Sequence, residues 1–255
     1  LSHASPLTTH ARVGMTYHFN WSVLWSGQTG SWLLHGVFIT LEISLVGWFI
    51  AAALGILSGA LRTLPILPLR WLAAGYVEFF RNVPLLVWMF FWYFAVPPFL
   101  PQALQDWLLD HGAEFWAGAF ALGVYHGARF SGVIRSGIGA IPKTQFEAAA
   151  STGLTTAQAS RLVILPIAFR LIVPPATNET LNLLKNSSVA LTIGVAELTF
   201  QVRQIETYSA KAFEALAAGT VIYLVLCLMI SAVMARIERR TAIPGMITRG
   251  SASVS

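Results

Sequence analysis

Cysteine is almost absent from this 255-residue chain, which contains Cys227 alone. A single cysteine excludes an internal disulfide and a Cys-x-x-Cys metal or redox site. Charged residues are also scarce, at 11% of the chain, whereas soluble domains contain roughly 25%. Because 56% of the residues are hydrophobic, the composition predicts an integral membrane protein.

Catalytic and nucleotide-binding motifs are missing as well. The sequence has no GxxxxGK[S/T] loop, so we do not expect this chain to hydrolyse ATP, and it has no GxSxG motif. Four histidines fall on different segments without metal-ligand spacing, namely His18, His35, His111 and His126. We assign the histidines no chemistry, and we expect no catalytic residue, metal site or cofactor in this chain.

Five stretches contain the about 20 mostly apolar residues that a membrane-spanning helix needs. They cover residues 32–61, 69–96, 115–134, 168–198 and 213–234. The fourth stretch contains Pro174 and Pro175, which remove backbone donors, and we expect its helix to be interrupted there. The predicted fold class is therefore an all-α integral membrane protein with five transmembrane helices.

Basic residues alternate between the two sides of these spans. Those after spans one, three and five include Arg62, Arg70, Arg135, Lys143, Arg161, Arg170, Arg236, Arg239 and Arg240, whereas the other loops have little basic excess. Lys and Arg mark the cytoplasmic side, so we expect the N-terminus outside and the C-terminus inside. The net charge of +5 is thus explained by membrane orientation, and we expect no nucleic-acid partner. The predicted organisation is a periplasmic segment 1–30, a transmembrane domain 31–240 and a cytoplasmic tail 241–255.

Small residues recur at helix-packing spacing in two of the spans. Gly55 with Gly59, and Gly123 with Gly127, each form a GxxxG pair, which lets two helices approach closely in lipid. The pairs are compatible with packing within the chain or with a subunit interface.

A polar segment at 142–166 separates spans three and four on the predicted cytoplasmic side. It contains two capping-box pairs, Thr144 with Glu147 and Thr155 with Gln158. Gly153 lies between them, where a helix ends with a residue in the left-handed region. We expect a helix over 145–152 and a second over 156–165 that ends before Pro166. Such a pair is either a surface for a partner protein or a capped loop.

The same segment resembles a known family motif. Glu147-Ala148-Ala149, then Gly153, then Val163-Ile164-Leu165-Pro166 is similar to the EAA loop of ABC importer permeases, E-A-A-x3-G-x9-I-x-L-P, with Val163 replacing the usual Ile. Residues 80–87, 139–143 and 174–188 are similar to the polar amino acid subfamily of these permeases. The resemblance covers roughly residues 30–240.

This resemblance implies a permease subunit in a bacterial inner membrane, without enzymatic activity of its own. The residues that would couple it to a cytoplasmic ATPase subunit are Glu147, Ala148, Ala149 and Gly153. The ATPase subunits would bind ATP, a second permease subunit (a copy or a paralogue) would complete the pore, and a periplasmic solute-binding protein would deliver the substrate. The alternative is a self-sufficient, ion-coupled secondary transporter or channel, and a membrane enzyme comes third.

Polar side chains inside the spans indicate where a substrate passes. Ionisable groups in lipid are costly and usually face a cavity or one another. We predict a path along Arg81, Arg129, Asn178, Glu179, Asn182, Lys185, Asn186, Ser187 and Ser188. Each could instead belong to a satisfied structural network, and Glu78 is placed to pair with Arg81.

Arg129 bears on the substrate. It lies six residues before Arg135, which puts it roughly 9 Å further into the membrane. The Ala128-Arg129 pair resembles glutamate/aspartate-type permeases, and a guanidinium binds a carboxylate bidentately. We expect an acidic amino acid as substrate, unless Arg129 extends to the membrane surface instead.

Overall fold

The computed structural model describes residues 17–241, with backbone only at Thr241. Most of the predicted segment 1–30 and nearly all of the predicted tail 241–255 therefore lie outside the described residues. The elements in chain order are η1 (Trp21–Leu24), α1 (Thr29–Leu61), α2 (Leu67–Arg81), α3 (Leu85–Phe90), η2 (Phe91–Ala95), η3 (Pro97–Phe99), α4 (Gln102–Asp110), α5 (Ala113–Gly139), α6 (Lys143–Ser151), α7 (Thr156–Ala159), η4 (Ser160–Ile164), α8 (Leu165–Asn186), η5 (Ser187–Ile193), α9 (Leu198–Ser209) and α10 (Ala212–Thr241).

The described residues form helices and no strand, as the composition predicts. Three helical segments are long and apolar enough to cross a membrane, Thr29–Leu61, Thr156–Ile193 and Ala212–Arg240, and Leu85–Ala95 is a shorter apolar helix. The predicted second span is divided between α2 and α3 at Pro84, because the residue before a proline is disfavoured in a helix. The count of five spans stays a prediction.

Close contact between α1 and α5 forms the centre of the structure. A Cβ on Gly55 would lie 2.4 Å from Cβ of Phe130 and 3.2 Å from the carbonyl oxygen of Gly127. A Cβ on Gly123 would lie 2.5 Å from Cβ of Ile50. The two GxxxG pairs therefore pack the chain against itself, because only glycine leaves room for the opposite backbone.

The predicted interruption at Pro174 and Pro175 is wrong. Helix α8 continues through both prolines to Asn186. Proline removes an amide donor, but its fixed φ is compatible with a helix, and contacts with α5 and α10 hold the remaining turns. The helix changes instead at Ser187, where η5 begins, and the chain turns at Gly194 with φ +91°.

The segment 142–166 forms two helices around a turn at Gly153, whose φ of +77° confirms the left-handed conformation. The capping box at Thr155 is also confirmed, since its backbone N–H donates to Gln158 Oε1 at 2.9 Å and the Gln158 N–H donates to its Oγ1 at 3.3 Å. The predicted box at Thr144 is wrong, because the helix begins at Lys143, directly after Pro142. Thr144 therefore lies inside the helix and does not cap it.

The second helix of this segment does not end before Pro166. Helix α7 continues through the π-helical turn η4 into α8 without a break. A π turn shifts the hydrogen-bond register by one residue, which accommodates a proline that has no amide to donate. Residues 156–186 therefore form one continuous helical rod.

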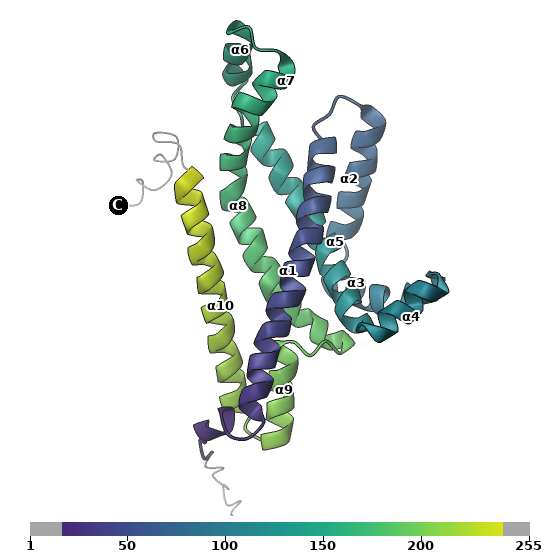
Figure 1. The fold of residues 1–255 in the computed structure, drawn as a ribbon, viewed down its shortest axis with the longest axis vertical. Coiled ribbons are helices and arrows are strands. Elements are labelled where there is room, and N and C mark those ends of the chain that lie inside the picture. Colours follow the sequence, from purple (N-terminus) through teal and green to yellow (C-terminus); the bar gives the residue numbers. More distant parts are fainter. Residues whose placement is uncertain (1–16, 242–255) are drawn as a thin grey trace, which may run out of the picture.

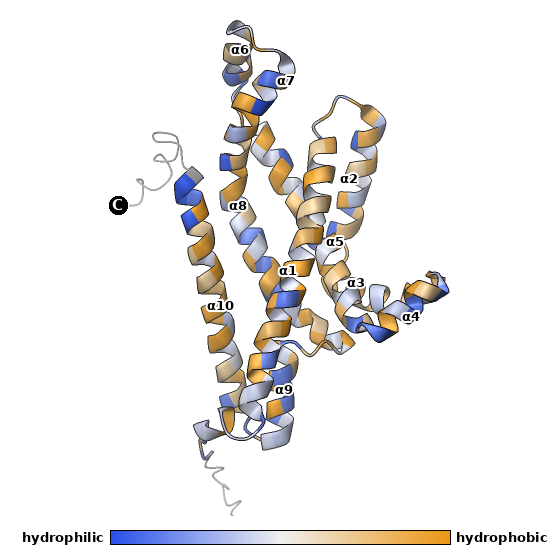
Figure 2. Cartoon of the chain, viewed as in Figure 1, coloured by the Kyte–Doolittle hydropathy of each residue, from blue (hydrophilic) through white to orange (hydrophobic). Residues whose placement is uncertain are grey.

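The polar helices gather at the ends of the long ones. Figure 1 shows α6 and α7 at the end where the α1–α2 connection and the last turns of α10 lie, with η1 and α9 at the opposite end. In Figure 2 hydrophilic residues concentrate at α6, α7, α4, α9 and the end of α10, and also appear in the middle of α8. The hydrophilic residues in the middle of α8 belong to the site described next.

Candidate functional site

A buried polar cluster joins α5 to α8. His126 is fully buried, Glu179 is 7% exposed, and the His126 Nδ1 lies 2.6 Å from Glu179 Oε1. On the other side of the ring, Nδ2 of Asn186 lies 3.1 Å from Nε2 of His126. An amide nitrogen donates, so Nε2 accepts and the ring proton lies on Nδ1, which donates to the carboxylate. The imidazole is thus neutral with both nitrogens satisfied.

Arg129 lies one turn along α5 from Tyr125, at the edge of this cluster. Its Nη2 donates to Tyr125 Oη at 3.0 Å, and its guanidinium carbon lies 5.1 Å from the centre of that ring. Its Nε is 4.0 Å from Glu179 Oε1, an oxygen that already accepts from His126. The side chain of Arg129 is 41% exposed. The guanidinium is held in place with most of its five donors still free.

The polar residues of α8 form one arc of the helix. At about 100° per residue, Lys185, Asn178, Asn182, Asn186 and Glu179 follow one another over about 120°. One edge of the arc, Asn186 and Glu179, contacts His126. At the other edge Asn178 and Lys185 are exposed. Five of the predicted path residues therefore share one face with Arg129 beside it.

Three other predicted path residues are not part of this arrangement. The hydroxyl groups of Ser187 and Ser188 donate to the backbone oxygens of Leu184 and Lys185, both at 2.7 Å, at the end of α8. Arg81 is exposed at the end of α2 and makes no hydrogen bond or ion pair with the described residues of the cluster.

The suggested pairing of Arg81 with Glu78 is wrong. Asn82 Nδ2 donates to Glu78 Oε2 at 3.2 Å, and no ion pair joins the two charged residues within the described part of the chain. The break after α2 places Asn82 within reach of that carboxylate, one turn away on the helix.

Of the four residues of the predicted coupling loop, three lie within α6 and Gly153 lies at the turn between α6 and α7. Glu147, Ala148 and Gly153 are exposed, whereas Ala149 is buried. Helix α6 contacts α7 and η4, so the pair is packed against itself and leaves one face open. The loop therefore presents a firm surface rather than a flexible strand.

Two features of the site are absent from the sequence-based predictions. His126 was assigned no chemistry, although its place three residues before Arg129 in an apolar span was a usable signal. The second is a buried carboxylate at the opposite end, Glu197, which caps α9 and accepts from the Tyr223 hydroxyl at 2.7 Å. This second group fixes α9 to α10.

Comparison with known proteins gives a consistent result. Residues 51–243 match the family described as the inner membrane component of binding-protein-dependent transport systems. The glutamate/aspartate import permease protein GltJ of Escherichia coli K12 is 38% identical over 241 residues, which cover 91% of this chain and 98% of that protein. The probable glutamine ABC transporter permease protein GlnM of Bacillus subtilis is 35% identical over 210 residues, which cover 82% and 93%.

Solved structures agree at the level of the fold. A crystal structure of an amino acid ABC transporter with histidines superposes with a TM-score of 0.75 at 31% identity, covering 89% of this chain and all of that one. An inward-facing structure of the MetNI methionine ABC transporter gives a TM-score of 0.71 at 22% identity, with 86% of this chain covered, and this similarity concerns the fold alone.

Proposed function

The chain belongs to the family of inner membrane components of binding-protein-dependent transport systems, and we propose that it is the permease subunit of an ATP-driven importer for acidic amino acids, glutamate or aspartate. It is a multi-pass inner membrane protein, and its relatives are permease proteins rather than ATP-hydrolysing enzymes. The family membership favours this function over a self-sufficient secondary transporter.

Arg129 carries the substrate assignment. Its nearest carboxylate, Glu179, is already bonded to His126, so the guanidinium has donors to offer to another anion. A guanidinium binds a carboxylate by two parallel hydrogen bonds. The E. coli relative with 38% identity is a glutamate/aspartate import permease, which supports the same class of substrate. The amides of Asn178 and Asn182 on the adjacent face would contact the rest of the amino acid.

Helices α6 and α7 form the proposed contact with the ATPase subunit. Glu147 and Ala148 are exposed, Ala149 packs beneath them, and the left-handed Gly153 sets the angle between the two helices. The small alanines allow a partner surface to approach closely. The partner subunits would bind and hydrolyse ATP, and their motion would enter this chain through α7.

The proposed topology has five spans with the N-terminus outside. The second span is made of α2 and α3 together, and the third is α5, whose 27 residues extend about 40 Å. Basic residues at the end that includes α6 and α7 make that end cytoplasmic. A second permease subunit, a copy or a paralogue, would face the polar arc of α8, and a periplasmic solute-binding protein would dock at the end of α9.

Reconstituted transport tests the proposal. The permease, its ATPase subunits and its binding protein would be placed in proteoliposomes with ATP inside, and uptake of labelled glutamate, aspartate, glutamine and arginine compared. We expect ATP-dependent uptake of glutamate and aspartate above the other two. Uptake that continues without ATP would remove the importer mechanism, and a preference for arginine would remove the acidic substrate while leaving the importer intact.

A further inference from the structure

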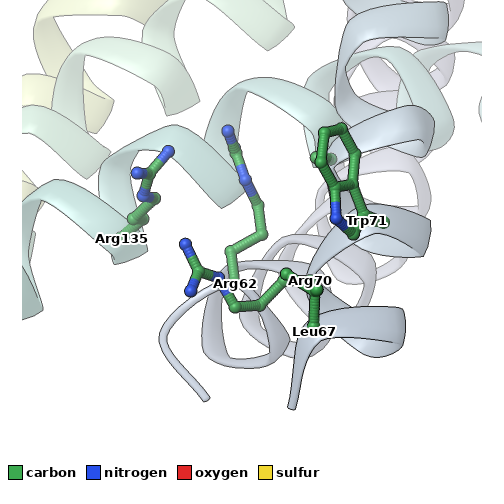
Figure 3. Close-up of a pocket in the computed structure, with 6 residues that line it drawn as sticks. Arg62, Leu67, Arg70, Trp71 and Arg135 are labelled. Atoms are coloured by element: carbon green, nitrogen blue, oxygen red, sulfur yellow. The ribbon is translucent and has the colours of Figure 1, made fainter. Parts of the chain in front are cut away.

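Three arginines meet at the proposed cytoplasmic end, outside the site described above. Arg62 follows the last residue of α1, Arg70 lies in the first turns of α2, and Arg135 lies near the end of α5. They line a pocket of about 170 Å³ together with Leu67, Trp71 and Ala74. Figure 3 shows the three arginine side chains reaching toward one another from three separate elements, with Trp71 at the edge.

These arginines have no acidic partner. Among the described residues, none of the three guanidinium groups takes part in an ion pair or a side-chain hydrogen bond. Burial and then the charge of Arg135 lower the pKa of Arg62, with Arg81 acting in the same direction and Glu78 against it. The group still stays charged at neutral pH, because an arginine in a protein is effectively always protonated. Three cations therefore share a small pocket whose described lining includes no acidic residue.

A separate apolar groove lies next in sequence to this pocket, although the two share no lining residue. It runs between α1 and α2, has a volume of about 420 Å³, and includes Leu61 and Leu72, the sequence neighbours of Arg62 and Trp71. Its other walls come from Leu54, Leu57, Ser58, Ala73, Gly75, Tyr76, Phe79 and Phe80. Trp71 and Leu72 are 70% and 71% exposed. An exposed tryptophan between charged and apolar residues is typical of a membrane–water interface.

We propose that the three arginines bind the phosphate-bearing headgroup of an anionic phospholipid of the cytoplasmic leaflet, with an acyl chain in the α1–α2 groove. Guanidinium groups suit phosphate oxygens because their donors are planar and paired. Basic pockets between membrane helices on the cytoplasmic side are known to bind such headgroups. The α1–α2 groove distinguishes a lipid from free phosphate or from an acidic protein segment, neither of which needs an apolar wall. The assignment of leaflet rests on the orientation in the proposed function.

Lipid retention by the complete transporter complex tests the proposal. The complex would be exchanged into nanodiscs of phosphatidylcholine containing a minor fraction of phosphatidylglycerol, then released and examined by native mass spectrometry. We expect the wild-type complex to retain phosphatidylglycerol at least about tenfold over the triple variant Arg62→Gln/Arg70→Gln/Arg135→Gln, since each basic residue near an anionic headgroup contributes to binding. The exposed Arg239→Gln on α10 is the matched control and should retain the lipid.

A groove variant separates the lipid from other anions. Gly75 lines the groove and has nothing within 4 Å of an added Cβ, so the side chain of Gly75→Leu would start in open space and occupy part of the groove. We expect it to reduce lipid retention with all three arginines in place.

Equal retention by the wild type and the triple variant would overturn the proposal, as would full displacement of the lipid by inorganic phosphate. Loss of the ATPase subunit from the triple variant, with lipid retention unchanged, would assign the pocket to protein docking. Retention is measured without transport, so its outcome is independent of which amino acid the complex imports.

Discussion

Helix α5 contributes to two polar regions that differ in how their charges are balanced. At His126 and Arg129 the side chains meet Glu179, Asn186 and Tyr125, so each group has a partner within the chain. About 13 Å from His126 along the same helix, Arg135 shares its pocket with two more arginines. We call the first region closed, because its side chains bond one another within the chain. We call the second open, because the pocket of its arginines includes no acidic residue.

The difference follows from depth. A charge inside the span cannot be hydrated, so an internal partner must be present for the helix to be stable. At the end of the span a guanidinium reaches water and headgroups, and no internal partner is required. The bonded His126–Glu179 pair is therefore evidence about stability, whereas arginine donors without an acidic partner, as at Arg129 and in the pocket of Arg135, are evidence about a ligand.

The largest effect is expected from a substitution that separates α5 from α1, because α5 contributes side chains to both regions. Gly55→Leu would place side-chain atoms inside Phe130, since even a Cβ there lies 2.4 Å from the phenylalanine Cβ. Helix α5 would then be pushed from α1, and the folded permease should be lost. Size-exclusion chromatography after detergent extraction measures this. Gly132→Ala on α5, where an added Cβ meets nothing within 4 Å, is the control and should behave like the wild type.

Removing the carboxylate of the closed region should have the next largest effect. Glu179→Ala leaves His126 without its acceptor and Arg129 without its nearby anion, and leaving a buried donor without an acceptor costs about 1–3 kcal/mol. Thermal unfolding of the detergent-solubilised complex gives the loss in stability. Glu179→Gln should be milder, because an amide oxygen still accepts the Nδ1 proton.

The comparison is sharpened by Arg135→Gln, which removes a charge from the open region. Since Arg135 makes no ion pair with any residue that the structure describes, its loss should change the stability by only about 0.5 kcal/mol or less. Equal losses from Glu179→Ala and Arg135→Gln would contradict the distinction between a closed and an open cluster.

A purely functional effect is expected at the exposed edge of the closed region. Arg129→Ala should raise the KM for glutamate uptake about tenfold or more, because a charged hydrogen bond to a carboxylate contributes about 1.5–3 kcal/mol. Uptake kinetics in proteoliposomes provide the measurement, and Arg129→Lys should restore part of the affinity. Arg239→Gln again serves as control. Unchanged acidic amino acid uptake by Arg129→Ala would remove Arg129 from substrate recognition.

A further effect is expected in the coupling loop, away from both regions. Gly153→Ala puts a side chain on a residue with φ +77°, which costs roughly 1–2 kcal/mol and shifts the turn between α6 and α7. We expect a reduced ratio of substrate transported to ATP hydrolysed, with lipid retention unaffected. Glu147→Ala, in the middle of α6, should change ATPase capture without changing the turn. If Gly153→Ala kept the wild-type ratio of substrate transported to ATP hydrolysed, coupling would not depend on the angle of this turn.

Local rules predicted the local features of this fold. Gly153 and Thr155 are found as expected because a left-handed turn and a capping box depend on residues only a few positions apart. The close packing at Gly55 followed from the spacing of small residues. These are interactions that the sequence neighbourhood determines.

The remaining features depend on tertiary contacts. Pro174 and Pro166 were expected to end helices, yet both lie within one, because packing and a π turn accommodate them. The bond between His126 and Glu179 joins residues 53 positions apart, and no periodicity within either helix reveals it. The arginine pocket likewise combines the ends of three helices that only the folded chain brings together.

The uninterrupted helix from Thr156 to Asn186 has a mechanical consequence. Its 31 residues extend roughly 46 Å, from the exposed loop at one end to the side chains that bond His126 at the other. A small twist about the long axis, applied at Thr156, must also rotate Glu179 and Asn186 relative to α5. The orientation of these two side chains toward α5 therefore depends on the angle of the exposed α6–α7 segment at the other end of the helix.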